Sequence, residues 1–214
     1  MQVGGHVSAL EEDPRQHDQI VVRVDGRIVA RIAPSAARAL GLVEGMPITE
    51  VLATALDEAT AFNAAARRAA RRLNRRALSC AETASDLERQ GFDPHIVSRV
   101  IEHLEGLGVL DDDRLGRALI EEAQARRGAG PALLRRKLAQ RQLDAPTITL
   151  LIETMTPDDG GADTARDLAI HRLAAMHDLD GTTKRRRLYG FLSRRGFEED
   201  IVLDVVEELV REDA

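Results

Sequence analysis

Aromatic residues are scarce in this chain. They make up 2% of its 214 residues, with no tryptophan, one tyrosine and four phenylalanines, while 43% of the residues are hydrophobic. Because aromatic side chains supply much of the buried area in most cores, the core here must be built from Leu, Val, Ile and Ala. The chain is also rich in Ala, Leu, Arg and Glu, which have high helix propensity. This composition predicts a mainly α-helical protein.

Paired cysteines, long apolar runs and a leader segment are lacking as well. Cys80 is the single cysteine, so no internal disulfide can form. No apolar run approaches the roughly 20 residues that a membrane span needs, and no charged-then-apolar leader opens the chain. We therefore expect a soluble, cytoplasmic protein that contacts no membrane.

Motifs of catalysis and metal binding are also missing. No phosphate-binding loop, dinucleotide fingerprint or nucleophile elbow occurs. The histidines show no i, i+4 pairing and no cysteine partner, which argues against zinc. The acidic run Asp111 to Asp113 lies at a predicted helix start and lacks the glycine of a calcium loop, so helix capping explains it. We expect no enzyme, no catalytic residue, no metal site and no cofactor.

Acidic residues are absent from three windows of a chain whose formal net charge is -6. Residues 59–81, 123–143 and 181–197 contain no Asp or Glu and six basic side chains each. Nearly all of these are arginines, whose guanidinium groups suit bidentate contacts to carboxylates and phosphates. The candidate partner-binding residues are Arg71, Arg72, Arg75, Arg76, Arg126, Arg127, Arg135, Arg136, Lys137, Lys184, Arg185, Arg186, Arg187, Arg194 and Arg195. The alternative for each window is a solvated helix face whose arginines pair with acids elsewhere in the protein.

The N-terminal part shows a weaker pattern. Residues 1–18 have no sustained period and are expected to form a flexible tail. In the region 19–60, β-branched residues alternate around Asp25-Gly26, which predicts a β-hairpin. Helices should follow, a short one from Pro34 and a long one with Thr49 as its N-cap.

An internal repeat occupies the rest of the chain. The segments "LERQGFDPHIVSRVIEHL", "LAQRQLDAPTITLLIETM" and "LSRRGFEEDIVLDVVEEL" align without gaps from Leu87, Leu138 and Leu192, and each predicts an amphipathic helix with apolar residues at i, i+3, i+4 and i+7. An acidic residue precedes each helix, at Asp93, Asp144 and Glu198.

The spacing of the copies leaves room for two further helices ahead of each one. In the middle copy these are expected from Asp112 to Arg127 and from Pro131 to Gln140, on either side of "GAG". We expect three-helix repeats over residues 61–110, 111–157 and 158–214. Tandem repeats that bury their faces against one another predict an elongated, curved array.

Three blocks of the sequence resemble the RecX family, the bacterial regulators of the RecA recombinase. They are "LNRRALSCAETASDLERQGFD", with Ser79 and Glu82 at capping-box spacing, "LGVLDDDRLGRALIEEAQARRGAGPALLRRKL", and "KRRRLYGFLSRRGF". The resemblance covers about residues 66–210. Thr83 and Asp86 depart from the leucine and basic residue usual in the family, and Leu115 and Leu119 replace aromatic residues.

The resemblance implies a monomeric negative modulator of RecA without an active site. Such a protein would lie in the groove of the RecA filament on DNA and inhibit ATP hydrolysis and strand exchange in recombination, DNA repair and the SOS response. Direct contacts to single- or double-stranded DNA would be weak.

Two other classes of protein fit parts of the sequence. A winged-helix-like DNA-binding transcriptional regulator would use the hairpin as a wing, with Arg23, Arg27 and Arg31 at alternating strand positions. A structural scaffold of helical repeats would need none of the basic windows.

The tract "KRRRLYGFLSRRGF" combines two patterns. Leu188, Phe191, Leu192 and Phe197 have core spacing, and Tyr189 lies beside them with its hydroxyl free to face outward. The basic residues are then expected on the outer face.

Overall fold

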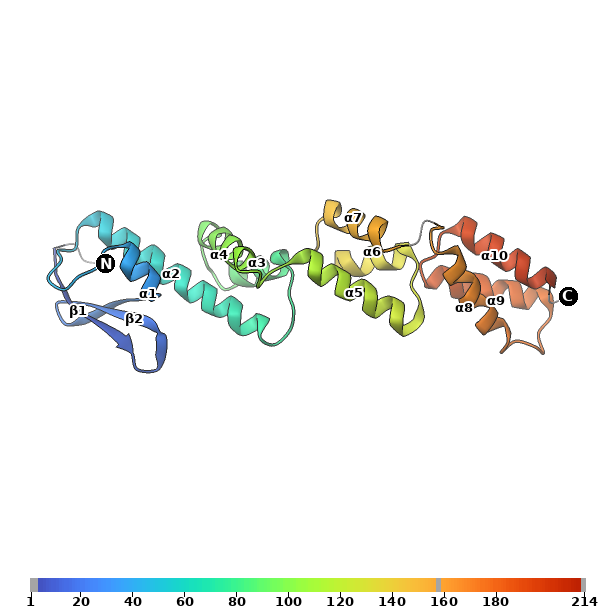
Figure 1. Ribbon diagram of the computed structural model, residues 1–214, viewed down its shortest axis with the longest axis horizontal. Coiled ribbons are helices and arrows are strands. Elements are labelled where there is room, and N and C mark those ends of the chain that lie inside the picture. The colour runs from blue at the N-terminus through green and yellow to red at the C-terminus, as the bar shows by residue number, and fades with distance from the viewer. Residues whose placement is uncertain (1–3, 157–158, 213–214) are drawn as a thin grey trace. The chain divides into compact units, whose positions relative to one another are not determined.

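The computed structural model describes residues 4–156 and 159–212, apart from the side chains of residues 126, 127 and 212. This part of the chain forms ten helices and one three-stranded antiparallel sheet, so the mainly α prediction is confirmed (Figure 1). Contacts divide the chain into two compact units. One unit runs to Leu78 and includes Thr83–Leu110; the other comprises Ser79–Glu82 and the chain from Asp111 onward.

The sheet of the first unit consists of β1 (Val7–Asp13), β2 (Gln16–Val24) and β3 (Arg27–Ile32), in that order. The turn between β2 and β3 is Asp25-Gly26, with φ of 48° and 79°, so the predicted hairpin is confirmed. The flexible tail predicted over residues 1–18 is wrong from Val7 onward, since β1 pairs with β2 there. As an edge strand β1 keeps Glu11 and Glu12 exposed side by side, while Asp13 is buried, so the strand shows no simple alternation.

Two helices complete the sheet's core. They are α1 (Pro34–Ala39) and α2 (Glu50–Leu73), and the Thr49 hydroxyl accepts a hydrogen bond from the Leu52 amide at 3.2 Å, as expected for an N-cap. The buried core residues are Val7, Val22, Val24, Ala30, Ile32, Leu42, Ile48, Ala53 and Leu56. No aromatic side chain is among them, as the composition predicted.

Two further helices follow α2, namely α3 (Cys80–Arg89) and α4 (Pro94–Gly106). The start of α3 is a capping box. The Ser79 hydroxyl accepts from the Glu82 amide at 3.0 Å, and the Glu82 carboxylate accepts from the Ser79 amide at 3.1 Å. In the first unit α4 packs against α2, and the buried faces carry Ala65 and Ala69 on α2 and Val97 and Val100 on α4.

The described residues of the second unit form six helices. They are α5 (Asp112–Arg127), α6 (Pro131–Gln140), α7 (Ala145–Met155), α8 (Ala162–Leu173), α9 (Gly181–Arg194) and α10 (Glu199–Glu212). The bounds of α5 and α6 are those expected from the sequence. One aliphatic core lies among α5, α6 and α7, and another among α8, α9 and α10, where Phe197 is the buried aromatic residue.

The three aligned segments share one backbone turn. The residue four places after the aligned leucine is left-handed in each copy, at Gly91 (φ 85°), Gln142 (φ 57°) and Gly196 (φ 81°). The next amide then donates to the carbonyl of the aligned leucine at 3.3 to 3.4 Å. This is the turn that ends many helices, and it shows that the three segments align in structure as well as in sequence.

Candidate partner-binding surface

Helix α9 has an inward stripe and an outward face. Asp180 caps its start by accepting from the Thr183 amide at 2.9 Å, and this contact, helped by the Thr183 hydroxyl, holds the pKa of Asp180 below its usual range. Lys184, Leu188 and Leu192 are buried at spacings of four residues. Lys184 was predicted on the partner surface, but its side chain is 9% exposed because it precedes Leu188 by one turn. The structure removes it from the candidate surface.

Outside its buried stripe, α9 carries the exposed candidates Arg185, Arg186, Arg187 and Arg194, which point to more than one side of the helix. Within residues 4–156 and 159–212, no ion pair or side-chain hydrogen bond engages any of the four. Four guanidinium charges therefore face solvent without an internal carboxylate to neutralise them, and they remain available to an acidic partner.

Arg195 has a different role from its neighbour Arg194. Its guanidinium donates to the Gly128 carbonyl at 3.0 Å and lies 4.9 Å from the centre of the Phe191 ring. This arginine holds the turn between α9 and α10 against the loop before α6. The prediction that Arg195 contacts a partner is not supported by this placement, since its side chain is half-buried in these contacts.

The "GAG" loop and the Arg-Gly-Phe turn fit together through their backbones. The Gly130 amide donates to the Arg195 carbonyl at 2.8 Å, and the Ala132 amide donates to the Gly196 carbonyl at 3.0 Å. Gly130 has no side chain to cap α6, so these carbonyls satisfy amides at the start of that helix. A Cβ atom on Gly196 would overlap the backbone of Leu133, which explains the glycine.

The second basic window, on α5 and α6, contributes fewer free charges. Arg135 lies 3.7 Å from the Glu198 carboxylate, while Arg136 and Lys137 are exposed and have no ion pair among the described residues. Arg126 and Arg127 are also candidates, but their side chains lie outside the described part of the chain.

The first basic window, on α2, is partly neutralised by Asp86 of α3. The side chain of Asp86 is 10% exposed, and its carboxylate lies 3.2 Å from Arg68 and 3.6 Å from the predicted Arg72. Arg71, Arg75 and Arg76 remain exposed. Asp86 therefore holds Arg68 and Arg72 of this window in internal ion pairs.

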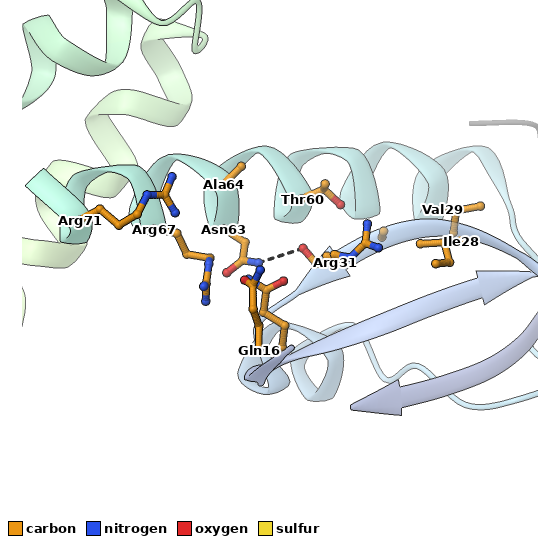
Figure 2. Close-up of a pocket in the computed structure, with 11 residues that line it drawn as sticks. Gln16, Ile28, Val29, Arg31, Thr60, Asn63, Ala64, Arg67 and Arg71 are labelled. Carbon is orange, nitrogen blue, oxygen red and sulfur yellow. Dashed lines mark hydrogen bonds between the residues drawn. The ribbon is translucent and has the colours of Figure 1, made fainter. Parts of the chain in front are cut away.

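A hollow of about 390 Å³ between the sheet and α2 is also lined by basic side chains (Figure 2). Arg31 pairs with Asp13 at 3.2 Å, and Arg67 pairs with Asp18. Asn63 donates to the Arg31 carbonyl at 2.9 Å, the dashed contact in Figure 2. Because two of its arginines are already paired, this hollow offers little free positive charge.

The same pairing bears on the wing interpretation of the hairpin. Arg23 pairs with Glu11 at 3.2 Å, and Arg31 pairs with Asp13. The amide of Arg15 and the guanidinium of Arg31 hold the pKa of Asp13 below its usual range, so this acid stays ionised and keeps Arg31 neutralised at neutral pH. Of the three arginines proposed for a wing, only Arg27 is exposed and without an ion pair in the described part of the chain.

Sequence reasoning missed the neighbours of Arg185 and Arg186 on α10. Leu203 and Arg211 line a hollow with them and with Tyr189. The sequence did contain a sign that Leu203 is exposed. It follows Val202 and therefore lies off the apolar stripe, although it is itself apolar. Nothing in the sequence of α10 alone places Arg211 beside α9.

The described residues contain no cluster of three His, Cys, Asp or Glu able to hold a metal ion. In the same residues no helix is both long and apolar enough to cross a membrane. The fold and this surface define a helical-repeat protein whose candidate site is a set of basic faces suited to a binding partner.

Comparison with known proteins identifies the family. Residues 159–206 match the family model of the third three-helix domain of RecX. The protein named Regulatory protein RecX of Thermobifida fusca is 30% identical over 138 residues, which cover 64% of this chain and 74% of that protein. That of Mycobacterium sp. (strain KMS) is 32% identical over 142 residues, or 64% and 76% of the two chains. The chain belongs to the RecX family, as its three sequence blocks indicated.

Solved structures show the same fold. A crystal structure of regulatory protein RecX is similar with a TM-score of 0.77 at 17% identity, covering 95% of this chain and 99% of the other. A crystal structure of RecX from Lactobacillus salivarius has a TM-score of 0.61 at 16% identity, covering 70% of this chain and 96% of the other. The helical-repeat fold with its N-terminal sheet is thus confirmed.

Proposed function

We propose that this chain is a negative modulator of the RecA recombinase. It binds in the groove of the RecA–DNA filament and inhibits ATP hydrolysis and strand exchange during recombination, DNA repair and the SOS response. Membership of the RecX family supports this proposal, since the relatives are named regulatory proteins. On this proposal the chain acts as a cytoplasmic monomer, by binding and without catalysis or a cofactor.

The observation that carries the proposal is the set of four exposed arginines on α9 that have no ion pair among the described residues. In a chain of net charge -6, Arg185, Arg186, Arg187 and Arg194 gather on one helix and have no ion pair among the described residues. Holding like charges together costs free energy unless a partner of opposite sign neutralises them. An acidic protein surface provides such a partner, and DNA phosphate adds contacts only where the filament exposes it.

The test is DNA-dependent ATP hydrolysis by the cognate RecA while the full-length chain is titrated in. We expect inhibition by the parent and weaker inhibition by the triple variant Arg185→Ala, Arg186→Ala, Arg187→Ala, with unchanged helical circular dichroism. The control triple Arg15→Ala, Arg27→Ala, Arg38→Ala removes equal charge from exposed positions outside the basic windows. It should inhibit as the parent does.

Binding to free DNA is measured alongside. Weak, salt-sensitive binding to naked duplex and single strands agrees with the proposal, because each phosphate contact adds to the salt dependence. Tight duplex binding with no effect on RecA would show that the proposal is wrong. If the folded α9 triple variant inhibits as well as the parent, these arginines are merely solvated.

A further inference from the structure

A hollow of about 450 Å³ opens at the surface between α9 and α10, which pack against each other in the second unit. Its size lies within the range of pockets that take small ligands or the side chains of a partner. The lining residues, which we call the α9–α10 groove, are Arg185, Arg186, Tyr189, Leu203, Val206, Glu207 and Arg211.

The middle of the α9–α10 groove is apolar. Leu203 is 45% exposed and Tyr189 is 37% exposed, while Val206 beneath them is buried. Leu203, Val206 and Glu207 lie at i, i+3 and i+4, so α10 turns one face toward the groove. The Tyr189 hydroxyl donates to the Glu199 carboxylate at 3.1 Å, which fixes the ring at the edge of this face. Leu203 and the Tyr189 ring thus offer apolar surface to a binding partner.

The rim of the α9–α10 groove is positively charged. Arg211 pairs with Glu207 at 2.8 Å, but Arg185 and Arg186 have no ion pair or side-chain hydrogen bond in the described part of the chain. Three guanidinium groups therefore face one carboxylate. The rim keeps two uncompensated positive charges on the α9 side of the apolar floor.

Charge and apolar area together restrict the occupant. A nucleic-acid backbone would pair with the arginines but gain little from Leu203, and a single half-exposed tyrosine is a poor platform for stacked bases. A purely apolar helix would cover Leu203 but leave Arg185 and Arg186 without counter-charges. An acidic segment with a bulky apolar side chain satisfies both, since it buries the leucine and gives each guanidinium a carboxylate.

We propose that the α9–α10 groove holds an acidic segment of a protein partner, with an apolar side chain on Leu203 and carboxylates at Arg185 and Arg186. The inference rests on the proposed function, in which RecA supplies that segment. The inference adds what the contact is made of. An apolar side chain flanked by acidic residues binds in the groove, so charge attraction is not the whole interaction.

The first experiment measures binding of the full-length chain to a fluorescein-labelled peptide with glutamates along one helical face and leucines beside them. Matched probes replace the leucines with serine, or the glutamates with glutamine. A labelled single-stranded oligonucleotide is the fourth probe. We expect the first peptide to bind about tenfold more tightly than either matched peptide, because each loses one kind of contact.

Variants of the chain locate the binding. Leu203→Ser and the double variant Arg185→Ala, Arg186→Ala should each weaken binding of the first peptide by about tenfold. Leu150→Ser is the control, since Leu150 is 56% exposed on α7 of the same unit and lies outside the groove. Equal binding of the serine peptide, or failure of the first peptide to bind, would overturn the inference. So would an oligonucleotide that binds with the same sensitivity to Leu203→Ser.

Inhibition of RecA separates this inference from the proposed function. If the parent inhibits ATP hydrolysis and Leu203→Ser inhibits less, both stand. If Leu203→Ser inhibits as the parent does while the α9 triple variant fails, the proposed function stands and the apolar anchor is refuted. If the parent does not inhibit RecA at all, the proposed function fails, and peptide binding then reports on the groove alone.

Discussion

Gly196 offers the sharpest test of how the second unit is held together. It has φ 81° and sits against the start of α6, where a Cβ would overlap the Leu133 backbone. Gly91 occupies the equivalent place in the first aligned segment with φ 85°, and a Cβ there would meet no atom within 4 Å. The two glycines therefore share the backbone conformation and differ in their surroundings.

The different surroundings of Gly91 and Gly196 set how much free energy of unfolding each alanine variant should lose. Gly91→Ala introduces a left-handed alanine and should cost about 1–2 kcal/mol. Gly196→Ala carries the same cost and also forces the turn away from α6, which breaks the contacts of the Gly130 and Ala132 amides with the Arg195 and Gly196 carbonyls. At about 1 kcal/mol for each lost hydrogen bond, Gly196→Ala should cost roughly 3–4 kcal/mol in all.

Urea unfolding of the full-length variants, followed by circular dichroism, measures both changes in the free energy of unfolding. Because the chain has two units, each transition is fitted separately if two appear. Equal destabilisation by the two alanines would refute the reasoning, because it would mean that the contact between the turn and α6 contributes nothing. Loss of RecA inhibition in Gly196→Ala without loss of stability would instead make the glycine part of the partner surface.

Three further predictions concern single positions. Gln142→Gly should raise the free energy of unfolding by about 0.5–1 kcal/mol in the same urea assay, because Gln142 is left-handed at φ 57° without being a glycine; a loss of stability would contradict this. The Thr147 hydroxyl and amide hold the pKa of Asp144 low, so its cap stabilises fully above the unfolded pKa of about 3.9 and is lost as the pH falls through the lower folded value. Asp144→Asn, which keeps a cap without titrating, should make acid unfolding less steep, and an identical acid transition would count against the assignment. Asp86→Asn should release Arg68 and Arg72 and so steepen the salt dependence of binding to single-stranded DNA. The control Glu58→Gln removes an equal charge from the exposed pair with Arg99 and should steepen it less. Equal slopes for the two variants would show that net charge alone matters.

Local features of the fold were predictable because they depend on nearby residues. The Asp25-Gly26 turn, the Thr49 cap and the bounds of α5 and α6 each follow from a short signal in the sequence. Strand β1 was missed because an edge strand with acidic side chains shows no clear alternation.

Contacts between distant segments were not predictable from one sequence. Asp86 captures Arg68 and Arg72 across 18 and 14 positions of the chain, and Arg195 reaches the carbonyl of Gly128. Neither partner can be identified from composition or period, because helix packing decides which side chains meet. The candidate surface could therefore be outlined from the windows without acids, while its division into free and engaged arginines required the structure.

Whether a charged side chain on a helix is buried or exposed depends on its position relative to the apolar stripe. Its charge alone does not decide this. Lys184 lies on the stripe with Leu188 and is buried, whereas Arg185, Arg186 and Arg187 follow it around α9 and are exposed. The three basic windows, equal in charge, are consequently unequal as surfaces. In the described residues the window on α9 keeps four arginines without an ion pair. In the first window Asp86 pairs with Arg72, and in the second Glu198 pairs with Arg135 and Glu82 with Arg141 at 2.9 Å. Since the α9–α10 groove adds apolar area beside these arginines, the last three helices have both components that tight protein recognition requires.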